Sequence, residues 1–484
     1  MRYDSGENVA YKALLHSHDP RIKYNLIVIT YDFDDSSIDS IKRQAEKVLH
    51  KSLNQVLDEA QLSEIRKTID INRKGLLGNV VEKYIFNKEP DIAPEPDFPK
   101  AKLELKTTPI KTSTRKGFSA KERLVLGMID YDNIIGERWE TSGFLRKNAN
   151  LLILFYLFKK HLSILDSKFT LIKLLKLLSD LPPADILQLK NDWEAIAAKI
   201  RGGKAHELSE GDTFYLGACT KGATYATNFR AQPRSEEKAQ RRAFSLKPKY
   251  LNFIIAENRA AIAQDHEDMI KGDKPKSIEE FVHEKLDAYL NMPADEIPDR
   301  TGIYFAPGSK GYYADLARAM LGAKSKKITE FEKADVTMKT IRLQKSGTPK
   351  ESMSFPAMDY MEIVKENWED STLRDMLSSK KFLFLVYQYD SKGILRFTKH
   401  MFWNIPYSDL EGHVKKVWEK TVELVKTGHA DKLPGIKNDP VCHVRPHGKN
   451  KNDKAMTPYG IPVTKKCFWL NASYIAEQIK NAKN

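Results

Sequence analysis

The chain has 484 residues, of which 41% are hydrophobic, and its 79 Lys and Arg against 65 Asp and Glu give a formal net charge of +14. These totals are enough for two or three domains with cores. They exclude a mostly disordered chain, a collagen and a small disulfide scaffold. The three cysteines are too few for a disulfide framework and favour a reduced, cytoplasmic protein. The basic excess favours a polyanionic partner.

Hydrophobic stretches are short throughout the chain. The longest covers residues 151–158, whereas a membrane span needs roughly 20 apolar residues. The first residues do not have the basic and then apolar pattern of a signal peptide. We therefore expect no membrane partner.

Apolar spacing predicts the following elements in chain order. Residues 37–62 repeat apolar side chains every three to four positions, which predicts an amphipathic helix capped by residues 35–37. A second helix is predicted around residues 81–85, before a proline-rich segment. The alternation at residues 103–107 predicts a half-buried strand. Residues 151–158 predict a buried strand or short helix, and residues 193–200 predict a helix that ends at a Gly-Gly pair.

Five short segments recur later in the chain, in the same order and at nearly constant offsets. They are residues 103–107 and 336–340, 121–122 and 350–351, 139–142 and 368–371, 193–208 and 418–433, and 243–250 and 467–474. The repetition predicts two diverged copies of one domain. We expect an N-terminal extension at 1–36, a first domain at 37–265, a linker at 266–275 and a second domain at 276–484.

A group of carboxylates and a lysine carries the predicted chemistry. Glu104 and Lys106 are two apart on the predicted strand, so their side chains project from one face. Asp97 lies at the turn before that strand and can converge with Glu104 on a divalent cation. Carboxylate oxygens suit Mg²⁺, and Glu82 on the preceding helix can complete the ligands. A metal ion in such a cluster promotes phosphodiester hydrolysis, with Lys106 beside the attacking water.

These motifs resemble a known nuclease family. Residues 75–82 (Gly-Leu-Leu-Gly-Asn-Val-Val-Glu), 96–99 (Pro-Asp-Phe-Pro) and 104–107 (Glu-Leu-Lys-Thr) are similar to the MutH branch of the PD-(D/E)XK nucleases. Residues 203–211, 219–223 and 240–247 are closer to its restriction-enzyme members, the two-domain endonucleases of the Sau-three-A type that cut at GATC. The resemblance is strong over about residues 40–260. It implies an α/β fold with two tandem MutH-like domains, each a mixed sheet flanked by helices.

The resemblance also implies roles for individual residues. Asp97, Glu104 and Glu82 would form the Mg²⁺ site, with Lys106 near the nucleophilic water and Lys147 as a further active-site lysine. The loop of Cys219, Thr220 and Lys221 would read bases, and the strand that carries Ser245 and Lys247 would approach DNA. The repair nickases of the family have a tyrosine associated with sensing adenine methylation where this chain has Ser245. The serine therefore favours a restriction enzyme.

Basic residues are dense in the second half of the first copy, where Arg241 and Arg242 are adjacent. Lys and Arg side chains neutralise phosphates and pair with guanine edges, which favours a DNA-binding face. The full set is Lys221, Arg230, Arg234, Lys238, Arg241, Arg242, Lys247 and Lys249.

The second copy lacks part of the predicted metal site. Thr337 stands where Glu104 would recur, although Lys339 persists, Glu330 lies near the position of Asp97 and Glu284 echoes Glu82. Its loop at residues 445–451, with Arg445 and His447, remains basic. We infer an inactive copy that still binds DNA, either as an effector domain that takes a second site or as a clamp. A purely structural second copy remains an alternative.

The sequence thus predicts a type II restriction endonuclease of the IIE-like kind. It would hydrolyse double-stranded DNA with Mg²⁺ before the G of GATC, leave 5′-phosphates, and dimerise on DNA because each chain has one active site. Two alternatives remain. One is a MutH-type mismatch-repair nicking endonuclease, which needs only one such domain. The other is a non-catalytic DNA-binding regulator, which the intact carboxylates disfavour.

Overall fold

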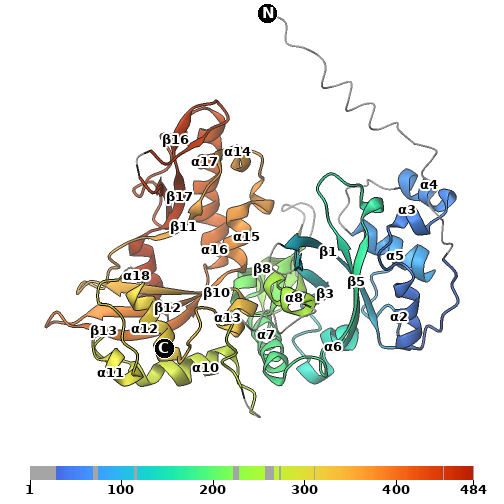
Figure 1. Ribbon diagram of the computed structural model, residues 1–484, viewed down its shortest axis with the longest axis horizontal. Helices are drawn as coiled ribbons and strands as arrows, with labels where there is room; N and C mark the ends of the chain where they lie inside the picture. Colours follow the sequence, from blue (N-terminus) through green and yellow to red (C-terminus); the bar gives the residue numbers. More distant parts are fainter. Residues whose placement is uncertain are drawn as a thin grey trace, which may run out of the picture. The chain divides into compact units, whose positions relative to one another are not determined.

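The computed structural model describes residues 29–68, 75–113, 117–221, 228–256, 266–271, 274–309, 311–450 and 452–482 (Figure 1). The chain forms two compact units. One consists of Met1–Ala93, Asp97–Pro109 and Leu151–Leu174, and the other of Pro94–Pro96, Ile110–Asn150 and Leu175–Asn484. The expected linker at 266–275 lies within the second unit, and its residues 272–273, like residues 1–28 of the expected extension, lie outside the described residues. The bounds of the four expected segments remain predictions.

Helices come before the first strand. Ser37 caps the first of them, as predicted, by accepting a hydrogen bond from the backbone N–H of Ser40 at 3.3 Å. The prediction of one helix over residues 37–62 is wrong, because the chain turns after Glu46. His50 there has a positive φ of 63° and donates its N–H to the carbonyl of Phe169 at 2.7 Å. The helices are α2 (Ile38–Glu46), α3 (Leu53–Val56), α4 (Glu59–Thr68) and α5 (Leu76–Phe86).

The first sheet has the strand order β2-β1-β4-β5. The strands predicted near residues 103–107 and 151–158 are confirmed as parts of β1 and β4. Figure 1 shows α2 to α5 gathered beside β1 and β5, and Ile41 and Val81 of these helices share a buried cluster with Leu105 and Leu152 of the sheet. The bounds are β1 (Glu104–Ser113), β2 (Gly117–Ala120), β4 (Asn150–Leu157) and β5 (Phe169–Lys176).

A second, antiparallel sheet of the first copy has the order β3-β9-β6. The helix predicted around residues 193–200 is confirmed as the end of α7. The bounds are β3 (Leu124–Met128), β6 (Leu216–Thr220), β7 (Phe229–Gln232), β8 (Ser235–Gln240), β9 (Arg242–Leu246), α6 (Gly143–Asn148), α7 (Pro183–Arg201), α8 (Pro248–Ile255), and the short helices η1 (Trp139–Thr141), η2 (Ile164–Asp166), η3 (Ala205–Glu207) and η4 (Glu210–Asp212).

The C-terminal half repeats this arrangement with a sheet of order β10-β12-β13 and an antiparallel sheet of order β11-β17-β14. The strands are β10 (Val336–Leu343), β11 (Met353–Ala357), β12 (Lys381–Tyr389), β13 (Leu395–Trp403), β14 (Cys442–Pro446), β15 (Lys454–Met456), β16 (Pro462–Thr464) and β17 (Lys466–Leu470). The helices are α10 (Ile278–Leu286), η6 (Asp287–Tyr289), α11 (Ile297–Thr301), α12 (Tyr312–Leu321), α13 (Thr329–Ala334), α14 (Tyr360–Ile363), η7 (Trp368–Asp370), α15 (Thr372–Ser379), α16 (Tyr407–Asp409), the π-helix η8 (Leu410–Val414), α17 (Lys415–Lys426) and α18 (Ala472–Asn481).

Tryptophan pairs mark the correspondence between the two halves. In the first, Trp139 of η1 packs against Trp193 of α7 with ring centroids 6.1 Å apart. In the second, Trp368 of η7 packs against Trp418 of α17 at 5.6 Å. Each pair is buried in a core beside its sheets. The predicted α/β fold with an internal repeat is therefore confirmed.

All three cysteines of the chain (Cys219, Cys442 and Cys467) are free and buried. Among the described residues, no helix combines the length and the apolar character needed to cross a membrane.

Candidate active site

A tight backbone turn brings Asp97 and Glu104 together. Phe98 and Leu103 pair through both of their backbone hydrogen bonds, at 2.9 and 3.1 Å, and Lys102 closes the turn with a positive φ of 51°. The residues that flank this pair, Asp97 and Glu104, therefore lie side by side. The six-residue spacing in the sequence is the length of this turn, which explains why the two carboxylates converge as predicted.

The two carboxylates hold each other's backbone in place. The N–H of Asp97 donates to Oε2 of Glu104 at 3.1 Å, and the N–H of Leu105 donates to Oδ2 of Asp97 at 2.8 Å. Glu104 is 2% exposed, so its position is fixed within the core of the first unit. One oxygen of each carboxylate thus accepts a backbone N–H group.

Lysines contact the other oxygen of each carboxylate. Lys106 is hydrogen-bonded to Oε1 of Glu104, which confirms that the two side chains share one face of β1. Lys88 lies 3.6 Å from Oδ1 of Asp97. The sequence reasoning missed Lys88, which follows the left-handed end of α5 at Asn87. Its backbone N–H returns to the carbonyl of Glu82 at 2.9 Å, and this turn aims the side chain at the cluster.

Glu82 comes to the cluster from α5. The helix is anchored to the turn by edge-on packing of Phe86 on Phe98, with ring centroids 5.4 Å apart. Burial first, and then the negative charge of Asp97, raise the pKa of Glu82 from 4.5 to about 7, although Lys88 and Lys106 oppose the shift. These interactions place Glu82 with Asp97, Glu104, Lys88 and Lys106 in one electrostatic cluster.

The chemistry of this cluster fits a hard divalent cation. Three carboxylates supply oxygen ligands only, the kind that Mg²⁺ prefers. The lysines now neutralise the carboxylates and lie where a cation would compete with them. The cluster is looser than a preformed chelate, because within the described chain the one trio of His, Cys, Asp or Glu ligand atoms all within 4.8 Å of one another lies elsewhere, at His283, Asp287 and His400.

Lys147 lies on α6, in the second compact unit, whereas the carboxylate cluster lies in the first. Its stem passes Gly127 of β3: a Cβ added at this glycine would lie 3.9 Å from Cδ of Lys147. The half-buried side chain is thus held against β3, and its participation in the active site remains a prediction.

Known proteins match both halves of the chain. The family described as "DNA mismatch repair enzyme MutH" matches residues 86–192 and 320–411. A relative described as "Type II restriction enzyme Sau3AI", from Staphylococcus aureus, is 35% identical over 462 residues, which covers 84% of this chain and 93% of the relative. The chain belongs to the MutH-like family of type II restriction enzymes.

More distant matches cover one domain's length. The DNA mismatch repair protein MutH of Haemophilus influenzae is 25% identical over 38% of this chain and 82% of its own length, and that of Vibrio vulnificus is 26% identical over 36% and 79%. The two regions matched by the MutH family fall one in each predicted copy. The predicted resemblance and the tandem MutH-like architecture of this restriction-enzyme family are therefore confirmed.

The predicted DNA-binding residues of the first copy gather where β6 meets β9. Lys221 and Arg241 are joined by a backbone hydrogen bond of 3.0 Å, and their side chains are half-buried and exposed, respectively. Thr220 is half-buried beside them, while Cys219 is 2% exposed. Residues 222–223 of the predicted loop lie outside the described residues.

Three other predicted DNA-binding residues are buried. Arg242 donates to the carbonyl of Ala218 at 3.0 Å, and Ser245 is fully buried on β9. Lys247 donates to the carbonyls of Thr213 and Ser379. Burial, and then the charge of Lys381, lower the pKa of Lys247 to about 7. DNA contact by these side chains remains a prediction, and it requires their surroundings to open.

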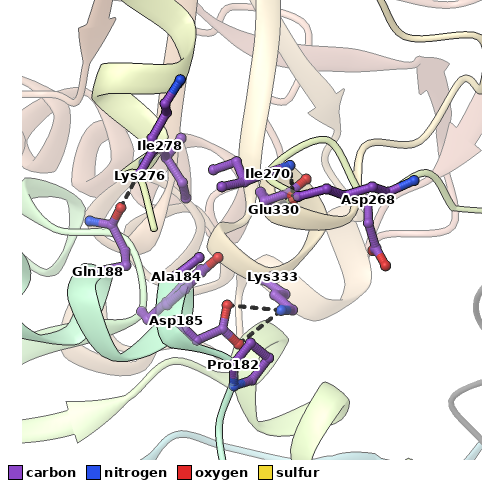
Figure 2. Close-up of a pocket in the computed structure, with 12 residues that line it drawn as sticks. Pro182, Ala184, Asp185, Gln188, Asp268, Ile270, Lys276, Ile278, Glu330 and Lys333 are labelled. Atoms are coloured by element: carbon purple, nitrogen blue, oxygen red, sulfur yellow. Dashed lines mark hydrogen bonds and ion pairs between the residues drawn. The ribbon is translucent and has the colours of Figure 1, made fainter. Parts of the chain in front are cut away.

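The carboxylates of the second copy are dispersed. Glu284 on α10 pairs with Lys276, and Thr337 on β10 provides no carboxylate. Glu330 accepts the backbone N–H groups of Met269 and Ile270 at 2.8 to 3.2 Å. Figure 2 shows Glu330 directed at Ile270, in a pocket of about 140 Å³ that also contains the ion pair of Asp185 and Lys333. Glu330 therefore fixes the expected linker and does not form a metal cluster.

The basic segment of the second copy begins at the end of β14, the counterpart of β6, where Arg445 lies on the strand and His447 follows it. The guanidinium of Arg445 lies 3.7 Å from the ring centroid of Trp469, and the ring of His447 meets the same indole edge-on at 5.4 Å. Both residues are exposed. The second copy therefore presents a cation and an imidazole, positioned by one tryptophan, at the place where the first copy presents Lys221.

Proposed function

We propose that this chain is a Mg²⁺-dependent endonuclease that cuts both strands of DNA before the G of GATC and leaves 5′-phosphate ends. The observation that carries the proposal is the cluster of Glu82, Asp97, Glu104 and Lys106 in a chain of the restriction-enzyme family. The GATC site rests on the resemblance to the Sau-three-A type enzymes. We propose the cytoplasm, where the three free thiols would stay reduced, as its location.

Asp97, Glu104 and Glu82 would bind the Mg²⁺. Oδ1 of Asp97 and Oε1 of Glu104 now contact Lys88 and Lys106, so a cation would take the place of these ammonium groups. A bound Mg²⁺ would lower the pKa of a water molecule and neutralise charge on the scissile phosphate. Glu82 must lose its proton to take part, because only the carboxylate binds the ion.

The lysines would position the reacting groups. Lys106, released from Glu104, would hold the attacking water beside the phosphate. Lys88 would balance the charge of Asp97 before DNA binds. The family resemblance adds Lys147 as a further active-site lysine.

DNA would lie against the end of β6 and the start of β9, where Lys221 and Arg241 supply positive charge. Cys219 and Thr220, predicted as loop residues, are the last two residues of β6. Arg242, Ser245 and Lys247 would support this strand from within and would reach DNA only if it opens. In the second copy, Arg445 and His447 would bind DNA without cleavage, at a second GATC site or as a clamp. One active site per chain favours dimerisation on DNA for a double-strand cut.

A plasmid digest tests this function. Wild-type protein with Mg²⁺ is expected to give discrete fragments whose sequenced ends begin at GATC, and EDTA is expected to prevent cleavage. Nicked circles that accumulate without linear product, with strand choice on hemimethylated DNA, would support the nicking alternative. An intact supercoiled plasmid, with binding unchanged by the metal, would support the non-catalytic regulator.

A further inference from the structure

Three metal-binding side chains meet in the second compact unit, among residues to which the proposed nuclease chemistry gives no role. Oδ1 of Asp287 lies 2.6 Å from Nε2 of His400 and 3.7 Å from Nδ1 of His283. One ligand atom from each of the three lies within 4.8 Å of the others. The two imidazole rings are 4.9 Å apart, with an angle of 62° between their planes, so they face the carboxylate from different directions.

The fold holds these residues on two different elements. His283 and Asp287 are four residues apart at the end of α10 and the start of η6, a spacing that puts them on one face of the helix. His400 projects from β13. Backbone hydrogen bonds join β13 to the segment that follows η6: the N–H of Asn291 donates to the carbonyl of Phe397 at 2.7 Å, and that of Ala294 donates to the carbonyl of Leu395 at 2.8 Å.

His400 is the most rigid member of the trio. Its side chain is 4% exposed, and its ring lies parallel to that of the buried Phe397, with centroids 6.3 Å apart. Burial lowers the pKa of His400, although Asp287 opposes the shift. The imidazole therefore favours its neutral form, the form that binds metals. His283 and Asp287 are 58% and 54% exposed, so an ion can reach them from solvent.

We propose that His283, Asp287 and His400 bind one divalent transition-metal ion of the Zn²⁺ class. Two imidazole nitrogens and one carboxylate oxygen suit Zn²⁺, Co²⁺ or Ni²⁺, whereas Mg²⁺ prefers oxygen ligands alone. Three protein ligands leave a position for water. The ion would replace the hydrogen bond between Asp287 and His400, because two ligands at about 2.0–2.2 Å from one ion lie roughly 3 Å apart or more. It would fasten α10 and η6 to β13.

This site differs from the proposed nuclease site in both ligands and location. Glu82, Asp97 and Glu104 offer oxygen ligands in the first compact unit, and the histidine site lies in the second. The two therefore respond to different ions. Under the proposed function, saturating Mg²⁺ would fill the carboxylate site and leave the histidine site available to a softer ion.

The test titrates Co²⁺ into the full chain, stripped with EDTA and returned to excess Mg²⁺, by calorimetry and visible absorption. We expect one Co²⁺ per chain and a raised melting temperature on binding. His283→Ala and Asp287→Asn are each expected to weaken binding by at least about tenfold, since loss of a partner that merely orients a ligand already costs that much. The matched controls His429→Ala, an exposed histidine of the same copy, and Asp97→Ala are expected to bind as wild type does.

Each other outcome would overturn the proposal. Absence of binding by wild type in excess Mg²⁺ excludes a transition-metal site. Binding that survives both His283→Ala and Asp287→Asn places the ion elsewhere, and binding lost in Asp97→Ala places it at the carboxylates. Because the two substituted side chains are exposed, the metal-free variants are expected to have the same melting temperature as metal-free wild type. This comparison separates lost ligands from lost structure.

Discussion

The two MutH-like copies use the same strand differently. On β1, Glu104 and Lys106 share a face, and a tight turn brings Asp97 beside them. On β10, Thr337 replaces the glutamate, while the lysine counterpart Lys339 is half-buried and burial lowers its pKa. The sheets and the tryptophan pairs are retained in both halves. The fold of a copy therefore does not depend on its carboxylate cluster, which can be lost while the framework remains.

Glu330 shows that the second copy differs from the carboxylate cluster of the first copy at more than one position. A carboxylate in the region of the Asp97 counterpart still exists, but it accepts two backbone N–H groups from the expected linker. The turn that brings Asp97 to Glu104 has no equivalent there, because α13 leads directly into β10. Restoring one side chain to the second copy would therefore not restore a metal site.

The largest expected effect comes from Asp97→Ala. Cleavage of a GATC plasmid should become undetectable, since removal of one stabilising group at a reaction centre alone costs roughly 10²–10³-fold. Glu330→Gln in the second copy is the control, because the amide oxygen can still accept the linker N–H groups, and it should cleave as wild type does. Equal loss of cleavage in both variants would contradict a single active copy.

The next largest effect on cleavage is expected from Lys106→Met. Without the ammonium group beside Glu104, the attacking water loses its orienting partner, and the cleavage rate should fall by about 10²-fold. Single-turnover rates at saturating DNA measure this step. The counterpart Lys339→Met should leave the rate unchanged. A variant Lys106→Met with wild-type rates would remove this lysine from the mechanism.

A moderate effect is expected at the segment of the second copy that we propose binds DNA. Arg445→Ala removes one exposed cation, so DNA affinity should fall at low salt, and the slope of log K against log salt should decrease by about 1. Binding is measured without divalent metal to prevent cleavage. Lys420→Ala, an exposed lysine already paired with Glu423, is the control. An unchanged slope for Arg445→Ala would favour a purely structural second copy.

The smallest expected effect concerns pH and Glu82. Its folded-state pKa of about 7 exceeds the ordinary 4.5, so between these values the folded protein binds more protons than the unfolded one. The free energy of unfolding of the metal-free protein should therefore fall as pH rises from 4.5 to 7. Glu82→Gln should lack this contribution, which thermal unfolding in EDTA at pH 5 and 7.5 detects. Glu64→Gln is the control, because a hydrogen bond from Lys83 lowers the pKa of that exposed carboxyl. If the stability of Glu82→Gln depends on pH as that of wild type does, the pKa of Glu82 is not raised in the folded protein.

Local patterns were sufficient to predict much of this molecule. The alternation around Glu104, the cap at Ser37 and the recurring tryptophan segments depend on residues close in sequence, and the structure contains all of them. The single helix over residues 37–62 failed because a distant strand competes for the chain: Phe169 accepts the N–H of His50. Periodicity alone cannot reveal such a partner.

Side-chain environments were less predictable. A lysine in a basic run is usually solvated, yet Lys247 is buried because distant carbonyls of Thr213 and Ser379 converge on it. Lys88 carries no motif, and only the turn after α5 directs it to Asp97. His283 and His400 are far apart in sequence and belong to different elements, so only the folded chain brings them together.

The turn between Asp97 and Glu104 sets the distance between their two carboxylates. Because the pairing of Phe98 with Leu103 sets the separation of the two carboxylates, the proposed active site depends on the number of residues in the turn. One inserted or deleted residue would shift the strand register and point one carboxylate to the opposite face. A change in the length of this turn can therefore inactivate a copy even when all of the proposed catalytic side chains are still present.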